Sequence, residues 1–215
     1  QYVDIEGSAY SETGLINRYR EMSQQPEAES AIDDITNEAI VTDQGVEPVK
    51  INVDNVKYSD NIKKKIIEEF DRVLKHLGFT YNGYDIFRQW YIDGRLYYFI
   101  DIDVDAPEKG IKKLTRVDPR KIRKVVEIQK KQDEKGLGYI ESELEFFVYN
   151  EKGISDIPTT QTAGKKIAPD SIVYVTSGLR TGRNEQVLSY LHKAIKPLNQ
   201  LRMLEDAVVI YRISR

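Results

Sequence analysis

The 215-residue chain contains no cysteine, which removes disulfides, thiolate catalysis and sulfur-bound zinc from the chemistry available to it. Histidine is scarce: His76 and His192 lie far apart, and neither has a second histidine at metal-ligand spacing. Nucleophile-elbow and zinc-protease motifs are missing. The run Gly164-Lys165-Lys166 fails as a phosphate loop because Thr159 stands where the upstream glycine is required. We therefore expect no catalytic residues, no metal ligands and no cofactor.

A strong net charge and a long apolar run are also lacking. The 32 basic and 35 acidic residues leave a formal charge of -3, so no overall field draws the chain to nucleic acid or membrane. No uncharged apolar run approaches the ~20 residues that cross a bilayer, and we expect no membrane span. With 40% apolar residues, the chain can bury one good core and a small second module.

The first half of the chain has helical patterns. Residues 1–14 are polar and predict a loose lead-in before a helix over 15–22. Pro26 starts a second helix with acidic residues in its first turn. Its predicted inner stripe consists of small and branched apolar residues: Ala28, Ala31, Ile32, Ile35 and Ala39.

A third helix is predicted over 60–77. Ser59 or Asp60 can cap it, and Gly78 supplies the stop. Its apolar residues fall on one helical face: Ile62, Ile66, Phe70, Val73, Leu74 and Leu77.

Strand patterns fill the middle of the chain. The alternation of Val49, Ile51 and Val53 with polar residues predicts a half-buried strand. The β-rich runs 87–92 and 95–100, separated by Asp93-Gly94, predict a hairpin. Further runs are expected to continue an antiparallel meander, with a surface loop before the last strand; these are 121–130, 139–149, the loop 151–170 and the strand 172–175. A helix over 119–133 stays open as the alternative.

The last predicted element is a helix from about 184 to 212. Pro197 lies inside it and is expected to bend it, because proline removes one backbone hydrogen bond. An apolar face is predicted from residues three or four apart: Leu191, Ile195, Leu198, Leu201, Leu204 and Val208. This face belongs either to an ordinary packed helix or to a strut that packs on copies of itself.

Two charged clusters suggest function. Asp101, Asp103 and Asp105 alternate on one predicted strand, which offers a metal-dependent nuclease or recombination enzyme as one hypothesis. Neighbours on one face are about 7 Å apart, however, and do not converge on one ion, so a solvated strand edge is favoured.

The second cluster is basic. Ten basic residues stand between Lys109 and Lys131, against Asp118 and Glu127. This favours a solvated sheet face or a subunit contact, and a nucleic-acid-binding module is the alternative. The candidate contact residues are Lys112, Lys113, Arg116, Arg120, Lys121, Arg123 and Lys124.

Five runs of the chain carry a family resemblance: Leu15-Ile16-Asn17-Arg18-Tyr19-Arg20-Glu21-Met22, Ser30-Ala31-Ile32-Asp33-Asp34-Ile35, Asn37-Glu38-Ala39-Ile40-Val41, Asp118-Pro119-Arg120-Lys121-Ile122 and the stretch from Leu191 to Arg212. These runs resemble portal vertex proteins of T-even-type contractile-tailed phages. The resemblance implies a structural, non-enzymatic subunit of a dodecameric ring in the virion, at one capsid vertex and formed in the host cytoplasm. Double-stranded DNA passes through such a ring during packaging and ejection. The partners implied are other copies of the chain, the packaging terminase, and neck and capsid proteins at the head–tail connection.

The predicted fold is α+β, with amino-terminal helices, an antiparallel meander or hairpin sheet and one long carboxy-terminal helix. By the resemblance, residues 15–183 would form a wing-like domain and 184–215 a stem-like helix. Because the chain starts at Gln1 and stops just after an apolar run, we expect it to be part of a longer protein.

Overall fold

The computed structural model describes residues 11–40, 48–132, 138–154, 164–181 and 186–214. The predicted α+β class is confirmed, since helices and antiparallel sheets both build the chain. The helices are α1 (Glu12–Met22), α2 (Pro26–Ala39), α3 (Asp60–Leu77), α4 (Phe79–Asp93) and α5 (Ile195–Ile213), with short 3-10 turns η1 (Pro107–Lys109), η2 (Pro169–Ser171) and η3 (Tyr190–Ala194).

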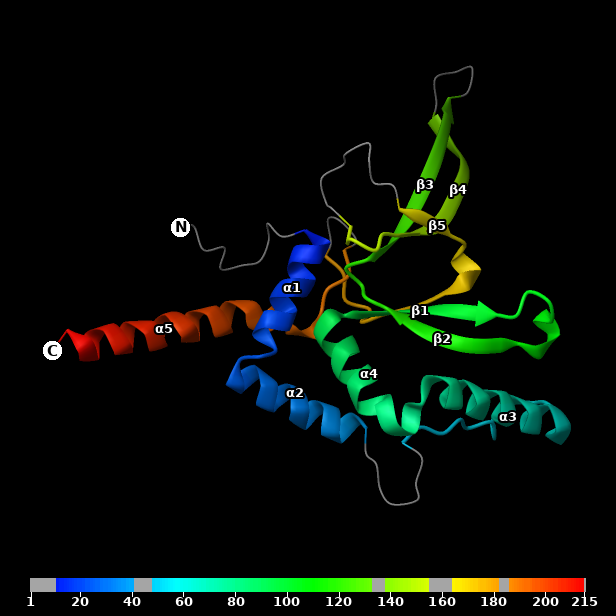
Figure 1. Cartoon of the computed structure of the whole chain (residues 1–215), viewed down its shortest axis with the longest axis horizontal. Coiled ribbons are helices and arrows are strands. Elements are labelled where there is room, and N and C mark those ends of the chain that lie inside the picture. The colour runs from blue at the N-terminus through cyan, green and yellow to red at the C-terminus, as the bar shows by residue number, and fades with distance from the viewer. Residues whose placement is uncertain (1–10, 41–47, 133–137, 155–163, 182–185, 215) are drawn as a thin grey trace.

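The strands form two small sheets, both antiparallel. The first has the order β2-β1-β6, built from β1 (Arg95–Ile102), β2 (Ile111–Val117) and β6 (Ile172–Thr176). The second has the order β3-β4-β5, built from β3 (Ile122–Gln132), β4 (Gly138–Tyr149) and β5 (Lys165–Ile167). Figure 1 shows two long projections from the body: the β3–β4 ribbon and helix α5.

Two apolar clusters hold the body together. One joins α1, α2 and α4 to η3 and the first residue of α5; its buried members are Leu15, Tyr19, Met22, Ala28, Ile32, Ile92, Leu191 and Ile195. The other lies between the two sheets and contains Tyr97, Ile122, Phe147 and Ile172. The base of α5 therefore belongs to the core of the body.

The three amino-terminal helices are confirmed, with corrections to their bounds and buried faces. Helix α1 begins at Glu12, inside the lead-in predicted over 1–14, of which residues 1–10 lie outside the described residues. Ser11 caps α1 by accepting from the Gly14 amide, and Gly78 ends α3 with φ 58°. In α2 the buried line is Ala28, Ile32 and Thr36, whereas the other members of the predicted stripe, Ala31, Ile35 and Ala39, are exposed. Residues four apart form a narrow ridge along the helix, and α2 packs on α4 through this ridge. No residue of α3 is fully buried, so its predicted apolar face is only half covered.

The predicted hairpin through Asp93-Gly94 is wrong. Residues 87–92 belong to α4, and the Gly94 amide closes that helix by donating to the Trp90 carbonyl at 2.8 Å with φ 72°. A glycine with positive φ serves a helix end as well as a strand turn, so the dipeptide alone did not distinguish them. Trp90 and Tyr91 follow Phe87 by three and four residues, and the Phe87 ring contacts both of their rings on one side of α4.

Other strand predictions had mixed outcomes. The strands 121–130, 139–149 and 172–175 are confirmed as β3, β4 and β6, and the alternative helix over 119–133 is wrong. The meander is wrong in one respect, because β3 and β4 begin a second sheet. The predicted strand at Val49, Ile51 and Val53 is coil in the structure: no described strand pairs with it, and an unpaired strand has no ladder hydrogen bonds.

The surface loop predicted over 151–170 lies partly outside the described residues. Its described part contains β5 and the beginning of η2, so it is more ordered than expected.

The terminal helix starts later than predicted. Residues 186–189 are not helical, η3 occupies Tyr190–Ala194, and α5 begins only at Ile195. Pro197 is thus the third residue of α5, where backbone N–H groups have no intrahelical partner, and the expected bend inside a long helix is wrong. No helix among the described residues is long and apolar enough to cross a membrane.

Candidate functional site

Helix α5 is the candidate site, because it leaves the body as a single rod (Figure 1). Its start is anchored, with Ile195 only 1% exposed and Leu191 in η3 6% exposed. Leu198 packs on the same cluster. Farther along, Leu204 is 64% exposed and Val208 53%. The rod therefore has an anchored base and an uncovered apolar end.

The predicted apolar stripe of α5 winds around the helix. Ile195, Leu198, Leu201 and Leu204 follow one another in steps of three residues, and each step falls about 60° short of a full turn. After three steps the apolar side has moved to the opposite face. Beyond the base, Leu201, Arg202 and Glu205 line a groove beside the α1–α2 turn, so the side that faces the body is mostly polar.

The exposed arc at the end of α5 is wide. Its large apolar members, each more than half exposed, are Met203, Leu204, Val208, Val209, Ile210, Tyr211 and Ile213. An ordinary surface helix has an apolar stripe of roughly 100°, while these residues are spread over most of the circumference. The arc is wide enough to contact more than one neighbouring element.

Polar contacts fix the base of α5. Tyr19 Oη lies 2.8 Å from His192 Nδ1, which ties α1 to η3. Ser189 Oγ accepts from the Leu191 amide and donates to the Tyr91 carbonyl, which ties η3 to α4. Burial lowers the pKa of His192 and raises the pKa of Tyr19 to about 12, so both groups are neutral at pH 7.

An ion-pair network connects α1 to the end of α4 and to the β2–β3 turn. Arg20 donates to both oxygens of Asp93, and it also lies 3.4 Å from Asp118, which Arg120 contacts at 2.7 Å. The hydrogen bonds to Asp93 raise the pKa of Arg20. Burial opposes ionisation of Asp118, but hydrogen bonds from Arg120 and the charge of Arg20 outweigh it and lower the pKa of that carboxyl.

A second buried charge joins α1 to both sheets. Arg95, at the start of β1, is fully buried; it pairs with Glu12 and donates to the Val187 carbonyl. The second oxygen of Glu12 lies 3.2 Å from Arg123 on β3. Sequence reasoning missed Glu12, Arg20, Asp93 and Arg95, although an arginine opening an apolar run such as 95–100 is a usable signal of a buried pair.

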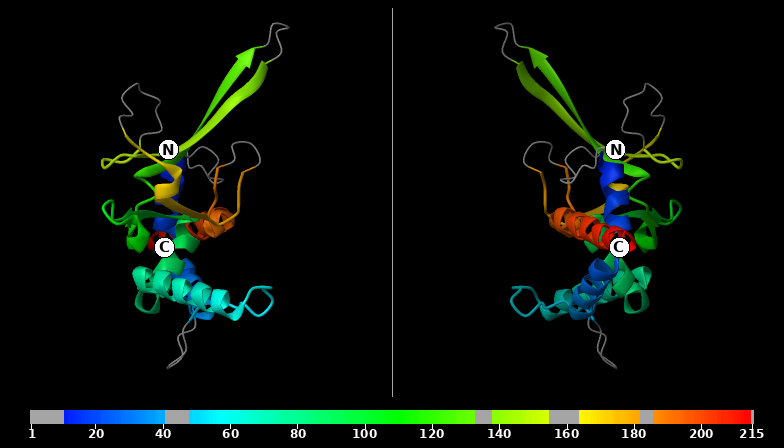
Figure 2. Two further views of the ribbon diagram at one scale, coloured as in Figure 1. Left: turned by 90° about the vertical axis from the view of Figure 1, so that its right-hand side faces the viewer. Right: turned by 90° about the vertical axis from the view of Figure 1, so that its left-hand side faces the viewer.

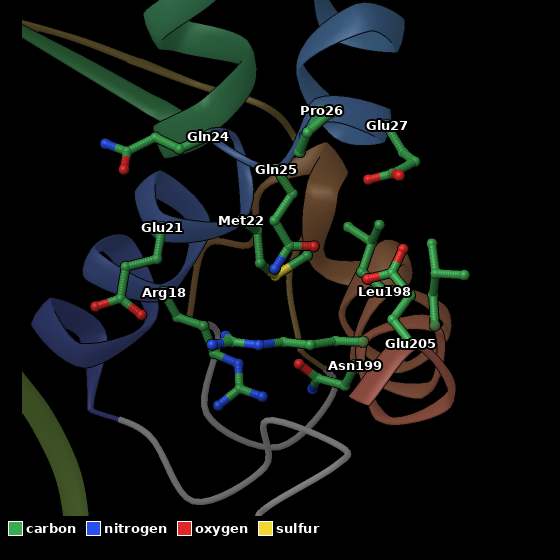
Figure 3. A pocket seen from close by; sticks show the side chains of 12 residues that line it. Arg18, Glu21, Met22, Gln24, Gln25, Pro26, Glu27, Leu198, Asn199 and Glu205 are labelled. Atoms are coloured by element: carbon green, nitrogen blue, oxygen red, sulfur yellow. The ribbon is translucent and has the colours of Figure 1, made fainter. Parts of the chain in front are cut away.

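The groove beside the base has a volume of about 590 Å³ (Figure 3). Met22, Pro26 and Leu198 give it apolar walls, and Glu27 and Glu205 stand at its rim. The Asn199 amide nitrogen is buried with no hydrogen-bond partner. The groove separates the polar side of α5 from the α1–α2 turn.

Comparison with known proteins decides the family. Residues 12–215 match the family described as Bacteriophage T4-like portal protein (Gp20). The chain belongs to this portal family. It is 40% identical to a protein named Portal protein from Vibrio phage KVP40, over 94% of this chain and 40% of that protein. It is 36% identical to a Portal protein from Salmonella phage ViI, over 100% of this chain and 40% of that protein.

The chain thus spans about 40% of the length of these two portal relatives. The resemblance read from the sequence is confirmed by both the family match and the relatives.

The basic candidates are spread over two sheets and the turn between them in this portal-family chain. Lys112, Lys113 and Arg116 lie on β2, Arg120 and Lys121 in the following turn, and Arg123 and Lys124 on β3, in a different sheet. Three of the seven are paired internally: Arg120 with Asp118, Arg123 with Glu12 and Lys124 with Glu145. Arg116 lines a cleft of about 600 Å³ near Arg20 and Asp118.

The acidic candidates do not converge either. Only Asp101 lies on β1, which ends at Ile102, so the expectation of three carboxylates on one strand is wrong. The Asp105 amide donates to Asp103 Oδ1 at 3.2 Å, as in a turn. His76 lies on α3 and His192 on η3. Among the described residues no three histidine, aspartate or glutamate side chains are placed to hold a metal ion.

Proposed function

We propose that the chain acts as a structural subunit of a portal ring at the capsid vertex. Such a ring forms the channel through which double-stranded DNA enters and leaves the head, and it carries the attachment point of the tail. The family membership supports this role. The observation that carries it is the wide, exposed apolar arc of α5, which is a surface built for contact with other protein.

Within that role the body and α5 have different tasks. Residues 15–183 act as the wing-like domain, and the stem-like part is residues 184–215. Leu191, Ile195 and Leu198 anchor the helix in its own body, while Leu201, Leu204 and Val208 pack on neighbouring protein. The winding of the apolar side supports this division, because Ile195 at the base and Leu204 near the end face opposite directions.

The proposed role is purely mechanical. We expect no nuclease or nucleotide hydrolysis, since the described acidic and histidine residues are dispersed over separate elements. The partners are further copies of the chain in a ring of twelve, DNA, the packaging terminase, and neck and capsid proteins. The ring belongs to the virion and is assembled in the host cytoplasm.

A chimera tests this proposal. In it, the present chain replaces the matching 40% of the Vibrio phage Portal protein, and the product is viewed by electron microscopy. Rings with a central channel are expected. A matched chimera carrying Leu204→Glu and Val208→Glu should stay unassembled, because charges would enter the apolar contact. Well-folded chimeras that never form rings would refute the role.

A further inference from the structure

The β3–β4 ribbon has open edges. The two strands pair through eleven registered positions, from Ile122 opposite Tyr149 to Gln132 opposite Gly138. A third strand, β5, covers only Phe147–Tyr149 at the base. In the part of the chain that the structure describes, no strand pairs with the outer edge of β3. Figure 2 shows the ribbon leaning away from the body in both views.

A two-stranded ribbon with open edges is unfavourable when it projects alone into water. A two-stranded hairpin is marginally stable in water, and a long open edge invites pairing with another strand. Both faces also expose apolar side chains, since Val126 on one face is 40% exposed and Leu144 on the other is 52% exposed. The described base of the ribbon therefore has the properties of a sheet that is completed by another molecule.

The charged side chains of the ribbon indicate which molecule pairs with its edges. Lys124 on β3 and Glu145 on β4 share one face and lie 2.8 Å apart, with side chains 35% and 45% exposed. The cation belongs to one edge strand and the anion to the other. Setting β3 of one copy beside the part of β4 that β5 leaves open would bring a lysine of the neighbouring copy close to each Glu145. Setting β3 beside β3 would oppose two Lys124 side chains, which is unfavourable.

We propose that the ribbons of neighbouring copies pair edge to edge, β3 of one copy beside β4 of the next, into a continuous sheet. The proposal rests on the proposed ring role. When the ribbons run along the rotation axis that relates the copies, every β3 is parallel to every other β3, and each β4 runs opposite to them. The joined strands are then antiparallel throughout, as they are within each ribbon. The contact is heterologous and so can close into a ring.

Cross-linking tests the contact in the 215-residue chain, which contains no cysteine of its own. One preparation carries Glu127→Cys on β3 and the other carries Leu144→Cys on β4; these positions are register partners on one face. The two preparations are mixed at increasing protein concentrations, up to the solubility limit, and treated with a flexible bismaleimide. We expect mixed dimers at least fivefold above the dimers that either preparation gives alone. A matched control is Lys152→Cys, in an exposed turn outside the strands.

Charge reversal then identifies the contacting strands. Adding Lys124→Glu to the Glu127→Cys chain should lower the mixed dimer about threefold to fivefold, the effect of one surface ion pair. Adding Glu145→Lys to the Leu144→Cys partner should restore it. If Lys124→Glu lowers the mixed dimer and Glu145→Lys in the partner does not restore it, the charge change has disturbed the ribbon itself, and the edge contact is overturned.

Two further outcomes overturn the proposal. Abundant dimers from the Glu127→Cys preparation alone would indicate that β3 pairs with β3. Mixed dimers no more abundant than those formed with Lys152→Cys would show that the ribbons do not contact each other. The ring role has its own test in the chimera. Rings without ribbon cross-links would reject the edge pairing and leave the ring role standing. Ribbon cross-links without rings would reject the ring role and leave the contact between ribbons standing.

Discussion

Arg20 on α1 donates from Nε and Nη2 to the two carboxylate oxygens of Asp93, at 2.9 and 2.7 Å, at the point where α4 ends. Asp93 is 2% exposed, so this pair carries a buried charge that needs its partner. The neighbouring residue Tyr19 contacts His192 in η3, at the base of α5. Through these adjacent residues, α1 fixes both the end of α4 and the base of the projecting helix.

Arg20→Met should lower the free energy of unfolding by about 3 kcal/mol, because it leaves the Asp93 carboxylate buried without a counter-ion. The matched control is Arg72→Met, which breaks a pair with Glu69 whose side chains are 56% and 63% exposed. That change should cost no more than about 0.5 kcal/mol. Urea unfolding measures both, and equal losses would contradict a special role for the Arg20–Asp93 pair.

The chain should lose stability as the pH falls below about 6.5, partly through His192. Burial lowers the pKa of His192 in the folded chain, so the unfolded chain binds a proton first. The contribution of this group is complete above the unfolded pKa and declines as the pH drops toward the folded pKa. Unfolding at several pH values between 5.5 and 7.5 checks the slope. His192→Gln should flatten it, and an unchanged slope would exclude His192 as its source.

Gly94→Ala should destabilise the chain by about 2–4 kcal/mol. A methyl group there would lie 2.7 Å from the Leu188 carbonyl oxygen, and φ is 72°. Gly78→Ala is the control, since Gly78 also ends a helix in the left-handed region, with φ 58° and ψ 37°, but the added carbon would meet only the flexible Asn82 side chain. It should cost only about 1 kcal/mol. Thermal unfolding compares the two, and similar shifts in midpoint would mean that the close approach of residue 188 is relieved easily.

Ile195→Ala should cost about 2–5 kcal/mol, because Ile195 is 1% exposed at the base of α5. Leu204→Ala, in the same helix but 64% exposed, should change the free energy of unfolding by less than about 0.5 kcal/mol. Chemical denaturation of the two variants shows whether α5 is anchored only at its base. A large loss for Leu204→Ala would instead place its side chain in a contact within the chain.

Local signals in the sequence determined several elements. Helical spacing and Pro26 identified α1 and α2, Ser59 and Gly78 bracketed α3, and β-rich runs gave β3, β4 and β6. These signals are reliable because caps, proline and side-chain periodicity act within a few residues of the chain. The runs that resemble portal proteins likewise identified the family from the sequence alone.

Tertiary structure decided what depends on distant partners. Phe87–Ile92 is helical because its aromatic side chains pack beside Tyr190, about a hundred residues later. Residues 49–53 are coil because no described strand pairs with them. Arg95 is buried because folding brings Glu12 and the Val187 carbonyl to it. The apolar residues of α5 were present in the sequence, but the place where its contact with the body ends depends on how the α1–α2 turn packs beside it, and no local pattern records that packing.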